Sequence, residues 1–243
     1  MATPQDNLSL VEHLTELRTR LVYSLYAIVL LSIGAWASSE FIFDFVRGPI
    51  QPHLPTGGLV FTAPTDKFMA HLKVSILTGI IMACPVWIYH LWKFVEPGLY
   101  EKEKKYGLIF IFTGSSLFIA GVSFAYFFVM PAAFEVLLSF GGTTDTAMIT
   151  IGDYLSFFMM TTLVFGAAFE MPLVIVLLGM LGIVSSTGLR KSRRYAIVAI
   201  ATVAALFTPP DAISMLLLAV PMCLLYEISI LTLAFLEPKR KAS

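Results

Sequence analysis

Residues 154–184 read YLSFFMMTTLVFGAAFEMPLVIVLLGMLGIV, and this stretch decides the fold. As a helix rising about 1.5 Å per residue it would extend over roughly 45 Å, more than the hydrocarbon core of a bilayer requires. Its single formal charge, Glu170, stands near its centre, and Pro172 follows shortly after. A carboxylate at membrane depth is costly, and such residues usually face a protein interior, a wet cavity or a partner. Because Pro172 also weakens the backbone ladder there, the stretch predicts a functional site inside a membrane span.

The composition of the whole chain is that of an integral membrane protein. Of its 243 residues 58% are hydrophobic and only 13% are charged, whereas a soluble domain carries about 25% charged residues. No polar stretch is long enough for a soluble domain, so we expect a single transmembrane domain over 1–243. The net charge of zero argues against binding to nucleic acid.

Neither the cysteines nor the histidines form a pattern that indicates chemistry. Cys84 and Cys223 both fall in apolar segments, and the four histidines are scattered without metal-ligand spacing. The sequence has no phosphate-binding loop of the G-x-x-x-x-G-K-S/T kind. We therefore expect no cofactor, no metal site and no enzymatic activity.

The apolar runs predict an all-α protein with six membrane helices. An amphipathic cytoplasmic helix over about 9–20 is expected to precede them, with its leucines on one face. The six spans are expected at about 21–38, 69–92, 106–129, 154–184, 195–208 and 212–236. Proline-containing outer loops would then lie at about 39–67 and 131–153. The fifth span is short for a hydrocarbon core of about 30 Å.

The basic residues predict the orientation of these spans. With six spans both termini share one side, and that side collects most of the 16 lysines and arginines. Arg47 and Lys67 fall on the other side, with Lys73 just inside the second span. By the positive-inside rule both termini are expected in the cytoplasm.

Two acidic clusters stand on the expected cytoplasmic side. In the first, Glu12, Glu16 and Arg20 follow one another at four-residue steps on the polar side of the N-terminal helix. An ordinary solvated pair between Glu16 and Arg20 would explain this spacing. The second cluster lies in the loop 93–105, KFVEPGLYEKEKK, where Glu103 stands near a helix start that favours negative charge. The alternative is that Glu16 and Glu103 together form an acidic pocket for guanidinium groups, which offer planar forked donors.

Three further polar residues have structural explanations from the sequence alone. Tyr126 sits among apolar neighbours of the third span, where a core tyrosine with one hydrogen-bond partner is expected. Asp211 follows two prolines at the start of the last helix, and its side chain is expected to cap that helix. Glu227 is expected near the cytoplasmic end of the same helix.

Six sequence fragments resemble the TatC family of the twin-arginine protein translocase, in the order and on the topology of that family. They are HLTELR at 13–18, FVEPGLY at 94–100, FAYF at 124–127, FGAAFEMP at 165–172, LRK at 189–191 and TPPD at 208–211. The resemblance covers nearly the whole chain. It departs from the family at Glu96, where alanine is common, and at Lys104 and Lys105, where arginine is often found.

The resemblance implies a curved, glove-like bundle in the cytoplasmic (inner) membrane. It implies a receptor for signal peptides that carry paired arginines on folded cargo proteins. The partners would be single-span proteins of the TatA and TatB type, membrane lipids and further copies of the chain, and transport would draw on the proton-motive force.

The resemblance also assigns roles to residues by motif position. Glu16 and Glu103, with Arg18 beside Glu16, would engage the signal peptide. Glu170 would meet a polar group of a partner helix, with Tyr126 as a second intramembrane polar residue. The remaining matched positions, Pro49, Pro172 and Asp211, would be structural.

Two other classes of function remain open from the residues. One is a proton- or cation-coupled transporter of small molecules in which Glu170 is the coupling carboxylate. The other is a structural subunit of a different membrane complex.

Overall fold

The structure is a computed structural model that describes residues 10–54, 58–99, 101–139, 148–207 and 212–241; the side chains at 10, 102, 103, 207, 213, 214 and 236–241 are outside this description. The described residues are helical apart from connections and one isolated bridge between Val60 and Thr150. The α-helices are α1 Leu10–Trp36, α2 Ser39–Arg47, α3 Asp66–Met82, α4 Cys84–Val95, α5 Glu101–Lys104, α6 Gly107–Phe124, α7 Met130–Ser139, α8 Ile151–Phe169, α9 Met171–Met180, α10 Ser186–Lys191, α11 Arg193–Phe207 and α12 Ala212–Lys241. A π-helical turn, Ala125–Val129, joins α6 to α7, and short 3-10 turns lie at Gln51–His53 and Glu96–Gly98.

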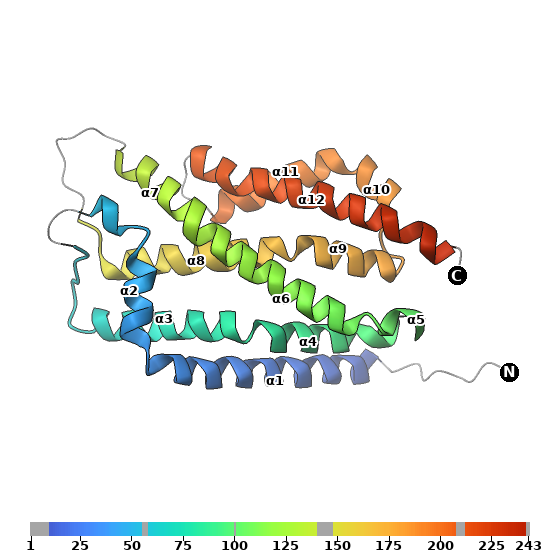
Figure 1. Cartoon of the computed structure of the whole chain (residues 1–243), viewed down its shortest axis with the longest axis horizontal. Coiled ribbons are helices and arrows are strands. Elements are labelled where there is room, and N and C mark those ends of the chain that lie inside the picture. Colours follow the sequence, from blue (N-terminus) through green and yellow to red (C-terminus); the bar gives the residue numbers. More distant parts are fainter. Residues whose placement is uncertain (1–9, 55–57, 100, 140–147, 208–211, 242–243) are drawn as a thin grey trace.

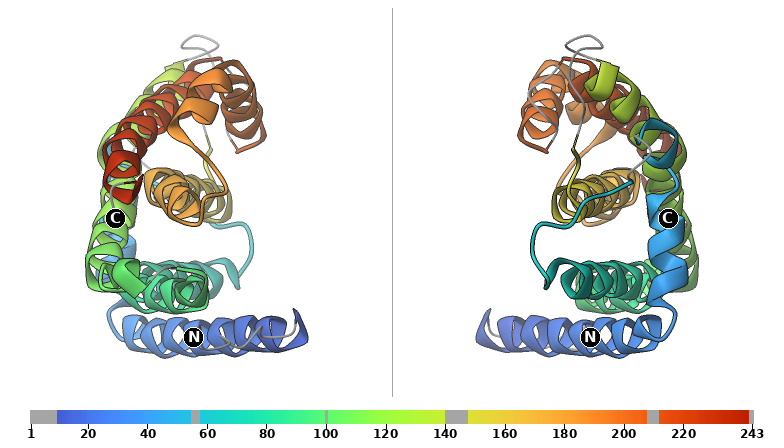
Figure 2. Two further views of the ribbon diagram at one scale, coloured as in Figure 1. Left: turned by 90° about the vertical axis from the view of Figure 1, so that its right-hand side faces the viewer. Right: turned by 90° about the vertical axis from the view of Figure 1, so that its left-hand side faces the viewer.

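The long helices form an open arc. Seen end on, α1, α3 with α4, α6 and α12 follow one another around the arc, and α8 with α9 lies inside it (Figure 2). The helices α6 and α7 run obliquely across the molecule, in front of α8 and α9 in the view of Figure 1. The start of α1, the short α5, and the end of α12 lie at one end of the molecule, which we call the basic end, and α2 lies at the other (Figure 1).

The first helix corrects one prediction. We expected an amphipathic helix over 9–20 and a separate span over 21–38, but α1 is one continuous helix. No glycine or proline interrupts it between Val11 and Ile33, so nothing breaks its backbone ladder there. Within it, Thr15 and Thr19 each donate a hydroxyl hydrogen bond back to the carbonyl four residues earlier.

Two of the expected spans are broken inside the apolar region. The span expected at 69–92 bends by 51° where α3 ends and α4 begins, at Ala83. The span expected at 154–184 is interrupted at Glu170, between α8 and α9, although Ile151–Met180 remains one stretch long enough to cross a membrane. In both cases a proline stands two residues after the break, Pro85 in α4 and Pro172 in α9. Because proline lacks an N–H, the carbonyl four residues earlier loses its helical donor.

The third span is longer than predicted. We expected it to end at about 129, with Pro131 beginning the second outer loop, but the helix passes through Pro131 and α7 continues to Ser139. The π-helical turn ends at Val129, two residues before Pro131, so the backbone bonding pattern already changes next to the residue that lacks an N–H.

The lengths of the helices bear on the number of spans. Among the described residues, four helical stretches are long and apolar enough to cross a membrane, and the bent pair α3–α4 makes a fifth. The helix α11, expected as the fifth of six spans, has only 15 residues, or about 22 Å. It is therefore shorter than the hydrocarbon core of about 30 Å.

At the end opposite the basic end, two tyrosines fasten α2 to the bundle. Tyr126, in the π-helical turn, donates its hydroxyl to the carbonyl of Phe45 at 2.8 Å and stacks on the Phe45 ring. Tyr154, buried in α8, donates to the carbonyl of Val46. Pro49 follows and is buried. The carbonyls that accept these bonds lie in the last turn of α2, where helical donors run out, and the Phe45 carbonyl also accepts from the N–H of Gly48 at 3.0 Å.

Candidate functional site

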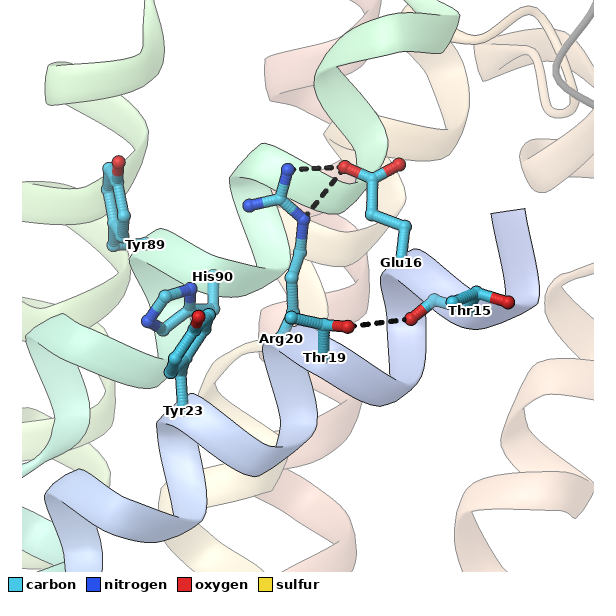
Figure 3. A pocket seen from close by; sticks show the side chains of 7 residues that line it. All are labelled: Thr15, Glu16, Thr19, Arg20, Tyr23, Tyr89 and His90. Carbon is cyan, nitrogen blue, oxygen red and sulfur yellow. Dashed lines mark hydrogen bonds and ion pairs between the residues drawn. The ribbon is translucent and has the colours of Figure 1, made fainter. Parts of the chain in front are cut away.

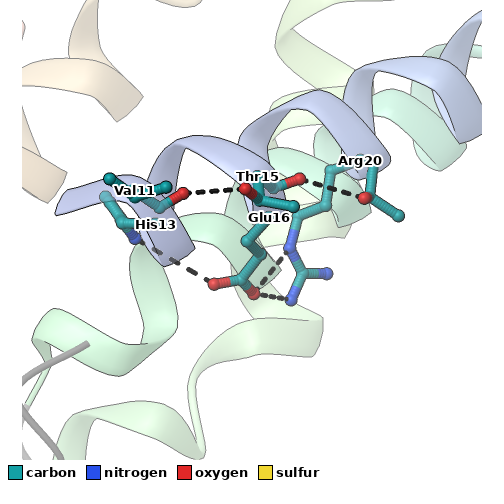
Figure 4. Close-up of polar contacts among 6 residues, drawn as sticks. Val11, His13, Thr15, Glu16 and Arg20 are labelled. Carbon is teal, nitrogen blue, oxygen red and sulfur yellow. Dashed lines mark hydrogen bonds and ion pairs between the residues drawn. The ribbon is translucent and has the colours of Figure 1, made fainter. Parts of the chain in front are cut away.

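Glu16 is held in place near the start of α1. Arg20, one turn further along the same helix, donates from both Nε and Nη2 to Glu16 Oε1, with the Nε contact at 3.0 Å. The other carboxylate oxygen, Oε2, lies 4.0 Å from His13 Nδ1 (Figure 4). The Glu16 side chain is 27% exposed and that of Arg20 is 23% exposed. The carboxylate is therefore partly desolvated and already holds a guanidinium.

Aromatic contacts join this face of α1 to α4. The His13 ring stacks on Phe94 with centroids 4.3 Å apart, and Tyr23 stacks on His90 at 5.8 Å. The His13–Phe94 contact brings the motif at 13–18 against the motif at 94–100, and the Tyr23–His90 contact joins the same two helices next to it. Their geometry fixes the position of Glu16 relative to the loop that follows α4.

A cavity of about 380 Å³ opens beside this ion pair (Figure 3). Glu16 and Arg20 line one part of it, and the rings of Tyr23, Tyr89 and His90 line another (Figure 3). The remaining lining residues are Thr15 and Thr19. A site with one carboxylate and several rings suits a planar cation, which can pair with the carboxylate and stack on the rings.

The second acidic cluster lies at the same end of the molecule. The helix α5, which carries Glu103, lies at the basic end with the start of α1 (Figure 1). The Glu103 side chain is outside the described side chains. Its neighbour Glu101 pairs with Lys104 at 2.6 Å. The additional acid Glu96 pairs with Lys93 at 2.6 Å, so its charge is compensated locally.

The other candidates that the sequence predicts on the cytoplasmic side are placed separately. Arg18 is exposed on α1. Glu227 of α12 pairs with Arg193 of α11 at 2.6 Å, which ties these two helices together. Asp211, expected as a helix cap, lies outside the described residues.

Glu170 is buried at the break between α8 and α9. Its side chain is 9% exposed, and its Oε1 has no hydrogen-bond partner among the described residues. Pro172 is buried in the first turn of α9. Cys84, at the break between α3 and α4, is also buried. An unpaired buried acceptor is rare in folded proteins and calls for an explanation.

The structure does not bring Tyr126 together with Glu170 as a pair. The Tyr126 hydroxyl is bonded to Phe45 at the α2 end, where it supports the fold. In contrast, sequence reasoning missed the contributions of His13, Tyr23, Tyr89 and His90 to the Glu16 site. A signal was present, because His13, Glu16, Arg20 and Tyr23 recur at three- and four-residue steps, which places them on one face of a helix.

Comparisons with known proteins agree on one family. A family model described as "Sec-independent protein translocase protein (TatC)" matches residues 12–221. A protein of that name from Desulforapulum autotrophicum is 40% identical over 95% of this chain and 86% of its own length. One from Carboxydothermus hydrogenoformans is 41% identical over 96% of this chain and 95% of its own length.

Two solved structures are also similar to this chain. A crystal structure of a twin-arginine translocase receptor, TatC, superposes with a TM-score of 0.79 at 36% identity and covers 90% of this chain and 97% of that one. A second crystal structure of such a receptor, in the detergent DDM, gives a TM-score of 0.82 at 36% identity, over 91% and 99% of the two chains. These matches do not favour the alternative of a small-molecule transporter.

Proposed function

Because the chain belongs to the TatC family of protein translocase components, we propose that it is the receptor that binds paired-arginine signal peptides for the Sec-independent export of folded proteins. The family is one of membrane proteins that are not enzymes. In this proposal Glu16 binds one arginine of the peptide, Glu103 binds the other, and Arg18 contacts the peptide beside them.

The observation that carries this proposal is the guanidinium already bound to Glu16. Two donors of Arg20 reach Glu16 Oε1, so this carboxylate lies where a guanidinium group can approach it and pair with it. The site is partly shielded from water, which strengthens a charge-assisted hydrogen bond relative to one at an open surface. Glu103 is assigned to the second arginine because α5 lies at the same end of the molecule.

The proposed topology has six membrane helices with both termini in the cytoplasm of a cell whose inner membrane holds the protein. It is supported by α1 starting and α12 ending at the same end (Figure 1). It is also supported by the basic residues, most of which belong to that end and its loops. The short α11 would then be the fifth span.

Photo-cross-linking tests the receptor function. A photoreactive residue in place of Thr19, which lines the cavity beside Glu16, is expected to cross-link to a peptide with paired arginines. The same residue in place of Met148, exposed and distant along the chain, is the control and should give no product. Equal labelling at both positions, or none at Thr19, would rule out binding at this site.

We assign Glu170 to a contact with a polar group on a single-span partner of the TatA or TatB type. Support comes from its Oε1, which is buried without a partner among the described residues. Assembly with such partners, with lipids and with further copies of the chain would follow, and the proton-motive force would drive transport.

Substitutions at Glu170 test the nature of this contact. Glu170→Ala is expected to reduce export at least about fivefold, since it leaves a polar group of the partner unpaired. Glu170→Gln keeps an acceptor and a donor, so it should retain export if hydrogen bonding is the role. Export of a folded reporter would be measured in cells that depend on the variant. Glu135→Ala, at an exposed position of α7, is the matched control, and an equal loss there would count against a role for Glu170.

A further inference from the structure

In the free protein the Glu16 carboxylate is already occupied. Arg20 places two donors on Oε1, and His13 lies beside Oε2 (Figure 4). The pair is four residues apart on one helix, so its two members are always within reach of each other. An arriving cation therefore meets a carboxylate that holds a resident guanidinium.

We propose that Arg20 is an internal competitor, a guanidinium that the ligand's arginine must displace from Glu16 before it can bind. This inference rests on the proposed function, in which Glu16 binds an arginine of the ligand. It assigns to Arg20, a residue of the same site, a role that opposes ligand binding.

Displacement requires a second position for the Arg20 guanidinium, and the cavity offers one. Arg20 stands between Glu16 and the rings of Tyr23 and His90 (Figure 3). These rings and that of Tyr89 line the same cavity of about 380 Å³. A guanidinium released from Glu16 can turn away from it and lie against these rings, where cation–π attraction replaces part of the lost ion pair.

The competition has a definite consequence for affinity. Every cation that needs Glu16 has its affinity reduced by the same factor, so Arg20 does not change the ranking of ligands. Instead, Arg20 sets a minimum binding strength that a ligand needs in order to displace it from Glu16. A single ammonium group has no planar fork, so on displacing Arg20 it replaces a well-bound guanidinium on Glu16 with a weaker contact. A ligand with a further contact outside Glu16 still binds, and the resident arginine assists its release by returning to the carboxylate.

The test measures binding of a fluorescent paired-arginine peptide to the full chain in lipid nanodiscs. Arg20→Gln is expected to tighten binding about three- to tenfold, because the competitor is gone. Arg20→Lys, which keeps the charge but not the fork, is expected to give a smaller gain and serves if the glutamine variant does not fold. The matched control is Arg194→Gln, which removes an exposed arginine in the first turn of α11 and should leave affinity unchanged.

A double-mutant cycle separates competition from general charge repulsion. In the background of Glu16→Gln the Arg20→Gln change should give no gain, since there is no carboxylate to release. The inference is overturned if the gain persists in that background, or if Arg20→Gln alone leaves binding equal or weaker. In either case the receptor function still stands, as long as binding by the unaltered chain depends on Glu16. If the unaltered chain shows no binding that depends on Glu16, both proposals fail.

Discussion

Replacing Glu16 and Glu103 together by glutamine is expected to weaken binding of a paired-arginine peptide by at least about 100-fold. Each charge-assisted hydrogen-bonded contact that is partly desolvated contributes about 1.5–3 kcal/mol, and two such contacts would be lost. Glutamine keeps the size of the side chain and its acceptor oxygen but removes the negative charge. Fluorescence anisotropy with the full chain in nanodiscs, at one fixed salt concentration, would measure the change.

A double substitution with the same change in charge provides the control. Glu101→Gln with Glu227→Gln also removes two carboxylates, and both of these acids are paired with a cation, Lys104 and Arg193 respectively. Its peptide affinity should stay within about threefold of the unaltered chain, since exposed pairs contribute little. Equal weakening by the two double variants would mean that net charge, and not the proposed carboxylates, governs binding.

The substitution Gly121→Ala is expected to destabilise the bundle by about 1–3 kcal/mol. A Cβ at Gly121 of α6 would lie 2.5 Å from the carbonyl oxygen of Phe165 and 3.0 Å from the Cα of Gly166, both in α8. Because these are backbone atoms, no side chain can turn aside, and the two helices must separate. The thermal midpoint of unfolding of the full chain in detergent would measure the effect.

Gly34→Ala is the matched control for this substitution. It adds the same methyl group to a helix, but nothing lies within 4 Å of the Cβ position at Gly34. Alanine also favours a helix over glycine by up to about 1 kcal/mol. The control should therefore melt at the same temperature as the unaltered chain or slightly higher, and equal losses at the two glycines would contradict the close approach of α6 and α8.

The prolines illustrate what the sequence could and could not predict about the fold. The apolar runs indicated helices that cross a membrane, and Pro172 indicated a weakened ladder next to Glu170, where α8 ends. The same reasoning missed the 51° bend before Pro85 and wrongly ended a helix at Pro131. A proline removes one donor wherever it stands. Whether the helix bends, breaks or continues depends on the packing around it, which local sequence does not contain.

In the candidate site too, contacts within one helix could be predicted from the sequence and contacts between helices could not. The Glu16–Arg20 pair follows from four-residue spacing within one helix, so it could be predicted. The stacking of His13 on Phe94 joins two helices, and the bond from Tyr126 to the Phe45 carbonyl joins α2 to the π-helical turn. Contacts between distant segments depend on the assembled bundle, so the sequence predicted one hydrogen-bond partner for Tyr126 but not that this partner is the carbonyl of Phe45 in α2.

Little of α1 is buried by the other helices, and this has a consequence for how the protein is synthesised and inserted into the membrane. Only 11% of its most apolar window is buried in the bundle, although the window is hydrophobic enough to cross a bilayer. Its stability in lipid therefore owes little to segments that are synthesised later. This first helix can enter the bilayer while the ribosome is still translating the rest, and α3 can dock on it afterwards through Gly79, whose missing side chain admits the backbone of Ile28 and Ser32.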